Sequence, residues 1–308
     1  MPVAEYIRHK LRADITPVSA ESPSWLGATL FAPARFATNP RVALFCFPGG
    51  GMTQRYFDLE GASFARAMAD AGMVTVAFDH AGIGESSAVQ DGFTLSAGAV
   101  ASAGAHAVRG IVAQLRHGTA SADLPPLPEL TVIGLGHSMG AMIVTLQQAV
   151  DRPFAGLALL GFSTRGLPEV LTAAEQAVAA QPLRAEADFV RLARLRFGQA
   201  LADISPRANG STALQAASGP LLTVAAMQSM LPGNIAAEAA TIDVPVYLSV
   251  GDRDIAGPAK AIPGAFSASP DVRLSVMPDA GHHPFIAPSA PRLYAEIISW
   301  ARALAGDA

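Results

Sequence analysis

Apolar residues gather in short runs along the chain, and segments with the spacing of amphipathic helices separate most of these runs. A continuous apolar run is typical of a strand that helices cover on both faces of a sheet. The runs predict strands over 25–31, 41–47, 73–78, 130–135, 154–162, 244–250 and 274–277. Helices are predicted over 56–71, 95–115 and 291–304, and another directly after residue 138. This alternation predicts an α/β fold, a mostly parallel twisted sheet with helices on both faces.

The alternation stops between residues 164 and 241, where no strand-like run occurs. Helical patterns follow one another over 169–180, 185–202 and 212–231, separated by Pro182 and by the polar stretch 205–210. An insertion of this length is too long for a plain loop. We therefore expect a core domain formed by residues 1–163 and 242–308, with a helical cap (lid) inserted at 164–241.

Composition narrows the class of protein. A chain of 308 residues with 51% apolar and 15% charged residues suits one large globular domain with an insertion, not a disordered chain. The net charge of −4 gives no footprint for nucleic acid. No window approaches the ~18 uninterrupted apolar residues of a membrane span, and the N-terminal segment lacks a signal peptide's apolar stretch. We expect a cytoplasmic protein with no membrane span; its oligomeric state stays open.

The single cysteine and a group of arginines add little chemistry. Cys46 alone excludes an intrachain disulfide and a cysteine metal cluster, and we expect it to be a small core residue within a strand. No cofactor and no metal are expected. The helical pattern 185–202 and the residue before it hold four arginines, which form a solvated face or attract an anionic substrate: Arg184, Arg191, Arg194 and Arg196.

A serine lies where the predicted strand before residue 136 meets the following helical pattern. The sequence there reads Gly136-x-Ser138-x-Gly140. A nucleophile held in a sharp, strained turn leaves room only for small residues two positions before it and two after it. Ser138 is therefore a candidate nucleophile whose Oγ projects out of the sheet.

A nucleophilic serine needs a base, and the base needs a carboxylate that holds it in the right tautomer. Both residue types follow predicted strands downstream. The strand 244–250 leads into Asp252 and Asp254, and the strand 274–277 leads into His282 and His283. The spacing alone leaves two candidates for each role.

Four motifs in this order resemble the α/β-hydrolase superfamily over about residues 25–305, as a serine esterase-like member with a helical cap. They are Phe47–Pro48–Gly49–Gly50–Gly51, Asp79–His80–Ala81–Gly82–Ile83–Gly84–Glu85–Ser86, Gly136–His137–Ser138–Met139–Gly140 and Gly281–His282.

The resemblance implies a catalytic triad and an oxyanion hole. By position within the motifs, the triad is Ser138, Asp254 and His282, and the oxyanion donors are the backbone N–H groups of Gly50 and Met139. The family's common His-Gly opening of the oxyanion loop reads Pro48–Gly49 here, so a glycine next to Gly50 stays an alternative donor.

The same resemblance implies a small-molecule ester or acyl substrate. We expect hydrolysis of a carboxylic ester or lactone of a small to medium apolar substrate. The stretch 44–51 also resembles thioesterases of carrier-protein pathways, so hydrolysis of acyl carrier or CoA thioesters is an alternative, as are C–C bond hydrolysis and a ligand-binding receptor on the same fold. The serine argues against the dehalogenases and epoxide hydrolases of this fold, which carry aspartate at the elbow.

Several neighbouring residues have two interpretations. His137 precedes the candidate nucleophile on a strand, so it points away and supports the elbow from beneath. His80 follows a strand near the same sheet edge and either bonds a loop or reaches the substrate. Four methionines either line an apolar acyl pocket or pack in the core: Met139, Met142, Met227 and Met230.

Overall fold

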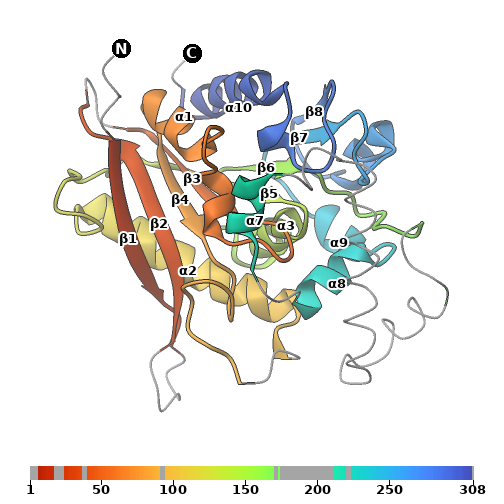
Figure 1. Ribbon diagram of the computed structural model, residues 1–308, viewed down its shortest axis with the longest axis horizontal. Coiled ribbons are helices and arrows are strands. Elements are labelled where there is room, and N and C mark those ends of the chain that lie inside the picture. The colour runs from red at the N-terminus through yellow and green to blue at the C-terminus, as the bar shows by residue number, and fades with distance from the viewer. Residues whose placement is uncertain are drawn as a thin grey trace.

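The computed structural model describes residues 6–16, 24–36, 40–90, 94–169, 173, 211–219 and 223–306 (Figure 1). Its strands are β1 (Tyr6–Asp14), β2 (Trp25–Pro33), β3 (Val42–Phe47), β4 (Val74–Phe78), β5 (Thr131–His137), β6 (Gly156–Leu160), β7 (Val246–Gly251) and β8 (Val272–Met277). Its α-helices are α1 (Phe64–Asp70), α2 (Ala97–His117), α3 (Met139–Asp151), α7 (Thr212–Ala217), α8 (Val224–Met230), α9 (Ala236–Ala239) and α10 (Ala290–Leu304). Short 3₁₀ turns include η1 (Gln54–Phe57) and η5 (Pro284–Ile286).

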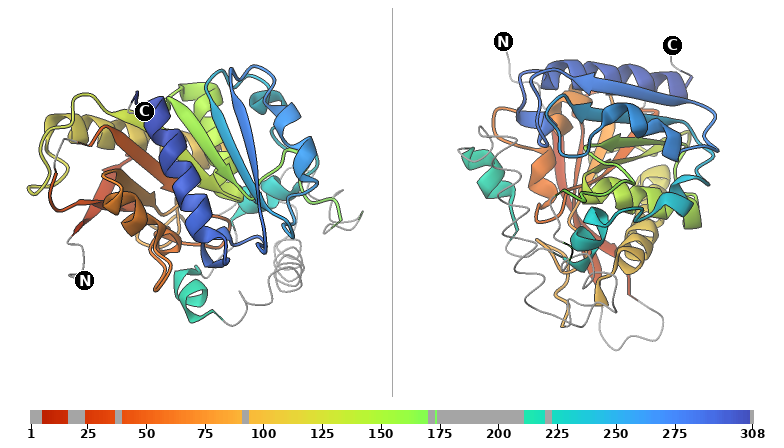
Figure 2. Two further views of the ribbon diagram at one scale, coloured as in Figure 1. Left: turned by 90° about the horizontal axis from the view of Figure 1, so that it is seen from above. Right: turned by 90° about the vertical axis from the view of Figure 1, so that its right-hand side faces the viewer.

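All eight strands form one sheet in the order β1-β2-β4-β3-β5-β6-β7-β8. The pairs β1–β2 and β2–β4 are antiparallel, and every pair from β4 to β8 is parallel. Helices α1 and α10 lie on one face and α2 and α3 on the other (Figure 2). The predicted mostly parallel sheet with helices on both faces is confirmed. Its carboxyl ends gather the loops after β3, β5, β7 and β8 at one edge.

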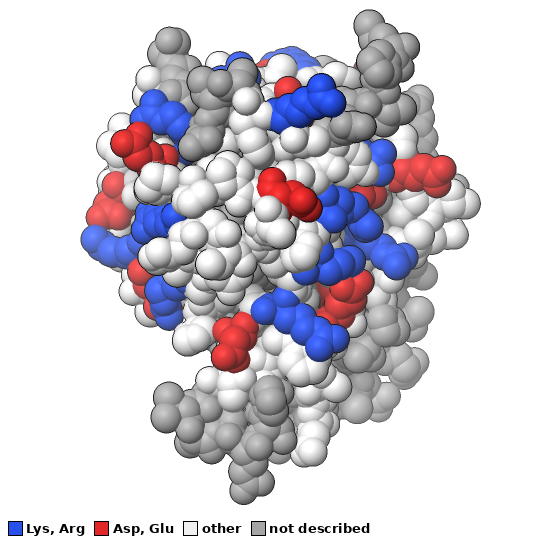
Figure 3. Space-filling view, turned by 90° about the vertical axis from the view of Figure 1, so that its left-hand side faces the viewer, with Lys and Arg blue, Asp and Glu red and all other residues white. Residues whose placement is uncertain are grey.

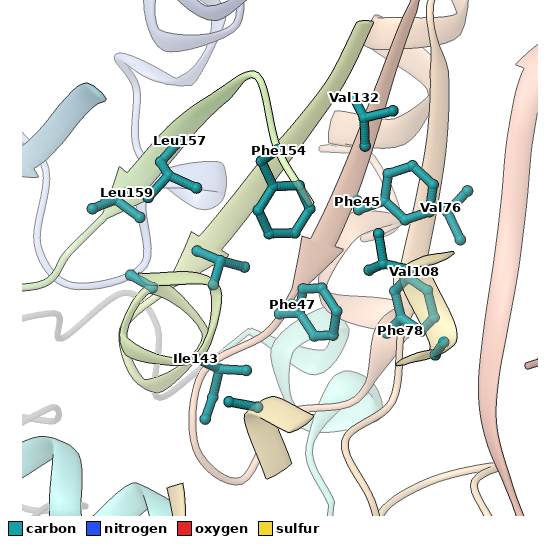
Figure 4. Packing of buried hydrophobic residues seen from close by; sticks show 14 of the residues in the cluster. Phe45, Phe47, Val76, Phe78, Val108, Val132, Ile143, Phe154, Leu157 and Leu159 are labelled. Carbon is teal, nitrogen blue, oxygen red and sulfur yellow. The ribbon is translucent and has the colours of Figure 1, made fainter. Parts of the chain in front are cut away.

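Strand β3 shows why an uninterrupted apolar run forms the centre of this sheet. Successive side chains point to opposite faces, so Phe45 and Phe47 join the layer under α2 and α3, where Val108 and Ile143 pack (Figure 4). Cys46 enters the layer under α1 and α10. It is fully buried, and burial raises the pKa of its thiol well above the ordinary value. Cys46 is thus a core residue, as predicted.

Strand β1 was not predicted, because its sequence lacks an apolar run. Arg8, His9, Lys10 and Arg12 are all exposed, and among the described strands β1 pairs only with β2. Basic side chains on an edge strand discourage pairing with another chain. On this side of the molecule Lys and Arg are interspersed with Asp and Glu, as Figure 3 shows, and Lys10 Nζ lies 2.6 Å from Glu85 Oε1. The described residues of this face therefore form no patch of a single charge sign.

The helix predicted over 56–71 is wrong in extent. The chain forms η1, then a turn at Gly61 with φ of 74°, and α1 begins only after Ser63, whose Oγ accepts the N–H of Arg66. An N-cap serine and a glycine with positive φ both interrupt a helix.

The helix predicted over 212–231 is likewise two helices. Helix α7 ends at Ala217, and α8 begins after Thr223, whose Oγ1 accepts the N–H of Ala226. The predicted helices 169–180 and 185–202 lie outside the described residues except at 169 and 173, and so do the four arginines from Arg184 to Arg196. Within the described ranges, no helix is long and apolar enough to cross a membrane.

Candidate active site

Ser138 occupies a strained turn between β5 and α3. Its backbone has φ 54° and ψ −120°, a region that residues with a side chain seldom adopt. The turn is held because the Ser138 N–H donates to the carbonyl of Leu160 on β6, 2.8 Å away, which extends the sheet hydrogen bonding by one residue. The strain exposes the serine hydroxyl at the carboxyl edge of the sheet.

The glycines on either side of Ser138 are required sterically. A Cβ atom on Gly136 would lie 2.3 Å from the backbone nitrogen of Ala141, and one on Gly140 would lie 2.0 Å from the carbonyl oxygen of Phe47. Both neighbours are backbone atoms and cannot rotate away. The spacing of the motif therefore reflects the close approach of α3 to β5 and β3.

We expect Gly140→Ala to lower the free energy of unfolding by about 3 kcal/mol or more, because the added methyl group overlaps the backbone after β3. Gly110→Ala is the matched control. Outside the backbone of its own helix, a Cβ at this position in α2 meets no atom of the described residues within 4 Å, and alanine stabilises a helix interior by about 1 kcal/mol over glycine. Urea unfolding followed by circular dichroism measures both variants. A Gly140→Ala protein as stable as the wild type would contradict the steric explanation.

His282 and Asp254 meet Ser138 from loops that follow β8 and β7. His282 Nε2 lies 3.0 Å from Ser138 Oγ, and His282 Nδ1 lies 2.8 Å from Asp254 Oδ1. The side chains of His282 and Asp254 are 3% and 2% exposed. Because a carboxylate only accepts hydrogen bonds, the Nδ1–H donates to Asp254 and the Nε2 lone pair faces the serine hydroxyl. This arrangement can withdraw the serine proton.

The alternative aspartate and histidine lie elsewhere. Asp252 accepts the N–H groups of Asp279 and Ala280 at 3.0 and 3.1 Å, so it anchors the loop that leads to His282. The ring of His283 is buried and packs edge-on against Tyr56, with ring centroids 5.8 Å apart. The structure thus brings together Ser138, Asp254 and His282, and assigns the other two residues to loop anchoring and packing.

His137 supports the elbow from beneath, as predicted. Its Nε2 lies 2.6 Å from the carbonyl oxygen of His282, and its ring stacks on Tyr56 with centroids 4.8 Å apart. Burial lowers the pKa of His137 well below the ordinary value, so the ring is neutral and its one N–H donates to that carbonyl. His137 therefore ties the backbone of His282 to the strand that carries Ser138.

The loop formed by residues 48–53, here named the glycine loop, packs against the elbow. A Cβ on Gly49 would lie 3.3 Å from Ser138 Cβ. Met139 is the first residue of α3, so its N–H has no acceptor within the helix. Among the described residues, the N–H of Gly50 also has no hydrogen-bond acceptor. Both predicted oxyanion donors are thus backbone N–H groups without an acceptor in the described part of the chain, and they lie in the two segments that adjoin Ser138.

His80 bonds a loop: its Nε2 lies 2.8 Å from the carbonyl oxygen of Pro48. The four methionines are buried. A cavity of about 20 Å³ adjoins Ser138 and His282, and its described lining includes Phe162 and Leu167 but none of the methionines. Core packing is the interpretation that these contacts favour for Met139, Met142, Met227 and Met230.

A glycine after β6 completes the surroundings of the histidine and was missed in the sequence. Gly161 has φ of 60°, and a Cβ on it would lie 3.2 Å from Asp254 Oδ2 and 3.3 Å from His282 Cε1. The available signal was a glycine close to the end of the predicted strand 154–162. Larger cavities lie away from Ser138: one of about 710 Å³ adjoins Val42 at the amino end of β3, the end opposite the serine.

Three buried histidines make the fold sensitive to acid. Burial lowers the pKa of His80 to about 4 and that of His283 to about 3, and it lowers the pKa of His137 well below the ordinary value. Below about pH 6.5 the unfolded chain binds more protons at these positions than the native state does. From pH 7.5 to 5 we expect the free energy of unfolding to fall by about 2 kcal/mol for each of His80 and His283, and further in the same direction for His137. Asp79 acts oppositely, because burial raises its pKa.

Urea titrations at pH 7.5 and pH 5 measure this loss, and His80→Gln is the informative variant because glutamine does not titrate. We expect the fall in the free energy of unfolding between pH 7.5 and pH 5 to be about 2 kcal/mol smaller in this variant than in the wild type, because one titrating histidine is removed. Exposed His117→Gln is the matched control. Equal stability of the wild type at both pH values would contradict the neutral state of the buried rings.

The sequence matches a model of one protein family over most of its length. A model described as the alpha/beta hydrolase family matches residues 43–297. The chain belongs to the alpha/beta hydrolase family. A comparison with curated proteins found no match. Among the described residues, no group of three or more His, Cys, Asp or Glu side chains is placed to hold a metal ion.

Solved structures of other hydrolases resemble this alpha/beta hydrolase along its whole length. A carboxyl esterase from Bacillus coagulans, in complex with glycerol, is 18% identical with a TM-score of 0.68. An esterase from Thermogutta terrifontis with malate bound and a lipase in an open form are 19% and 20% identical, both with TM-scores of 0.63. Each comparison covers 96% of this chain and 99% of the other. At these identities the likeness concerns the fold, and the chemistry has to be argued from the site.

Proposed function

We propose that this alpha/beta hydrolase cleaves a carboxylic ester or lactone through an acyl-enzyme intermediate. The observation that carries the proposal is the continuous hydrogen-bonded series from Ser138 Oγ through His282 to Asp254, with links of 3.0 and 2.8 Å. The serine sits at a strained, outward-facing turn, and the base and acid are both buried. These are the parts that activation of a serine hydroxyl requires.

In the proposed first half-reaction, His282 Nε2 takes the Ser138 proton as Oγ attacks the ester carbonyl carbon. The carbonyl oxygen becomes an oxyanion that accepts hydrogen bonds from the N–H groups of Gly50 and Met139. Asp254 stabilises the imidazolium that results. His282 then passes the proton to the leaving alcohol oxygen as the carbon–oxygen bond breaks, which leaves the acyl group on Ser138.

In the second half-reaction, water replaces the alcohol. His282 takes one water proton while the hydroxide oxygen attacks the acyl carbon, and the same proton returns to Ser138 Oγ when the acid leaves. We propose that segment 164–241 acts as a cap over this edge of the sheet. Contacts of its described residues support this, since Leu167 and Ser229 line the cavity at Ser138.

A substrate panel tests the proposed reaction. Matched butyrate esters, lactones and thioesters of the same acyl chain are assayed with the wild type, and Ser138 is labelled with a fluorophosphonate. We expect label on Ser138 and a higher kcat/KM for the oxygen ester than for the thioester. A higher value for the thioester would reassign the substrate class, and an unlabelled serine without turnover would indicate a binding protein on this fold.

A further inference from the structure

Two consecutive residues after β4 contact both ends of the glycine loop. His80 bonds the carbonyl of Pro48, the first residue of the loop, and Asp79 bonds the N–H of Gln54, the residue directly after it. The candidate oxyanion donor Gly50 lies between these two anchors. The loop after β4 is therefore the rigid support against which the glycine loop is held.

His80 is a neutral imidazole that donates a hydrogen bond to the Pro48 carbonyl. The ring is buried, with 2% of the residue exposed, and burial lowers its pKa to about 4. Because the Pro48 carbonyl can only accept, the hydrogen lies on Nε2, and the imidazole keeps this donor throughout the neutral pH range. Among the described residues the Nδ1 atom has no hydrogen-bond partner, so the ring is oriented by the bond to Pro48 and by packing against Phe47.

The Asp79 carboxylate collects three donors. Oδ1 accepts the Gln54 N–H at 2.7 Å, and Oδ2 accepts the Gln54 side-chain amide at 2.7 Å and the Glu85 N–H at 2.8 Å. The Gln54 side chain also accepts a short hydrogen bond from Thr29 on β2. A Cβ on Gly84 would lie 2.3 Å from the carboxylate, which explains a glycine in this motif. Gln54 is thus bound on both its backbone and its side chain.

The other side of the glycine loop is held by the last residue of α7 and by a residue that follows this helix. The Thr53 N–H donates to the Ala217 carbonyl at 2.8 Å, and the Gly219 N–H donates to the Gly51 carbonyl at 2.7 Å. Oriented dipoles stabilise an oxyanion only when they are already in place before the reaction. The peptide between Gly50 and Gly51 is bracketed by anchors on each side and can meet this requirement.

We propose that Asp79 and His80 are positioning residues that set the direction of the Gly50 N–H toward the oxyanion. They contact the glycine loop, not the substrate, and they act through it. The inference rests on the proposed function, because it assigns the glycine loop to oxyanion stabilisation. It predicts that loss of either anchor weakens transition-state binding while ground-state binding is retained.

The test compares His80→Leu with His80→Gln, whose amide N–H can still reach the Pro48 carbonyl. For a butyrate ester we expect His80→Leu to lower kcat roughly ten- to a hundredfold with KM within about twofold, and His80→Gln to restore most of the rate. The affinity for phenylboronic acid, whose serine adduct places an oxygen in the oxyanion hole, should fall in parallel with kcat. His117→Leu is the matched control, since His117 also bonds a backbone carbonyl but lies at the exposed end of α2.

Asp79→Asn gives a second, independent comparison if His80→Leu does not fold. The amide keeps the shape of the carboxylate but places a donor against donors, so kcat and boronate affinity should again fall together. Unchanged kcat in folded Asp79→Asn, or in folded His80→Leu, would overturn the positioning role while ester turnover by the wild type stands. Absence of turnover and of serine labelling in the wild type would instead overturn the proposed function.

Discussion

Replacing Ser138 by alanine is expected to lower kcat/KM for a butyrate ester by about 10⁴-fold or more. The variant keeps the elbow but has no Oγ to form the acyl-enzyme, so His282 has no hydroxyl to activate. Because the turn holds Ser138 at φ 54°, a residue with a Cβ already occupies this conformation, and alanine adds no new overlap. We therefore expect the thermal unfolding midpoint to stay close to that of the wild type.

Ser121→Ala is the matched control for this loss. Ser121 is a buried serine away from the elbow, in the loop after α2, where its Oγ accepts the Asp123 N–H. We expect its kcat/KM to equal that of the wild type and fluorophosphonate to label Ser138 as before. Ester turnover at the wild-type rate by purified Ser138→Ala would contradict the acyl-enzyme mechanism.

Asp254→Asn is expected to lower kcat by about 10³- to 10⁴-fold. The amide can donate to His282 Nδ1, which favours the tautomer with its hydrogen on Nε2 and leaves no lone pair for the serine proton. The negative charge that stabilises the imidazolium is lost as well. The shape of the side chain is unchanged, so packing around the 2%-exposed carboxylate is retained.

Asp252→Asn separates this effect from a general loss of loop structure. Asp252 lies two residues away, and its carboxylate accepts two N–H groups, those of Asp279 and Ala280. We expect a loss of kcat of less than about tenfold, together with a lower unfolding midpoint, because one loop hydrogen bond is weakened. An Asp252→Asn variant less active than Asp254→Asn would reverse the assignment of the triad acid.

The variants above test the mechanism of bond cleavage. We expect segment 164–241 to influence which substrate is cleaved. The described cavity beside Ser138 is small, about 20 Å³, and its lining comes from both the sheet edge and this segment. Residues 217–219 also bond the glycine loop directly. Changes in the segment are therefore expected to affect the rate as well as substrate preference, through the backbone of Gly51 and Thr53.

The parallel sheet could be predicted from local patterns because its strands are buried on both faces. An apolar run such as 42–47 is buried on both faces only at the centre of a sheet. The glycines at 136 and 140 allow the backbone of Ala141 and of Phe47 to approach more closely than any larger residue would permit. Strand β1 was not predicted, because an edge strand with a solvent-exposed face needs no continuous apolar run. The segment 212–231 was predicted as one helix because its apolar spacing continues across the caps at Ser218 and Thr223.

The candidate site, too, was partly predictable from the sequence and partly dependent on the tertiary structure. Spacing alone was enough to name Ser138, but it left Asp252 as an alternative to Asp254 and His283 as an alternative to His282. The resemblance to the α/β-hydrolase superfamily favoured Asp254 and His282 by their positions within its motifs. Only the tertiary structure shows that the side chains of Asp254 and His282 reach the serine, since which side chain faces it depends on where β7 and β8 end relative to β5. The anchoring of the glycine loop by Asp79 and His80 could not be predicted from the sequence for the same physical reason. Asp79 and Gln54 are 25 residues apart, and they form hydrogen bonds only because the sheet places β3 beside β4.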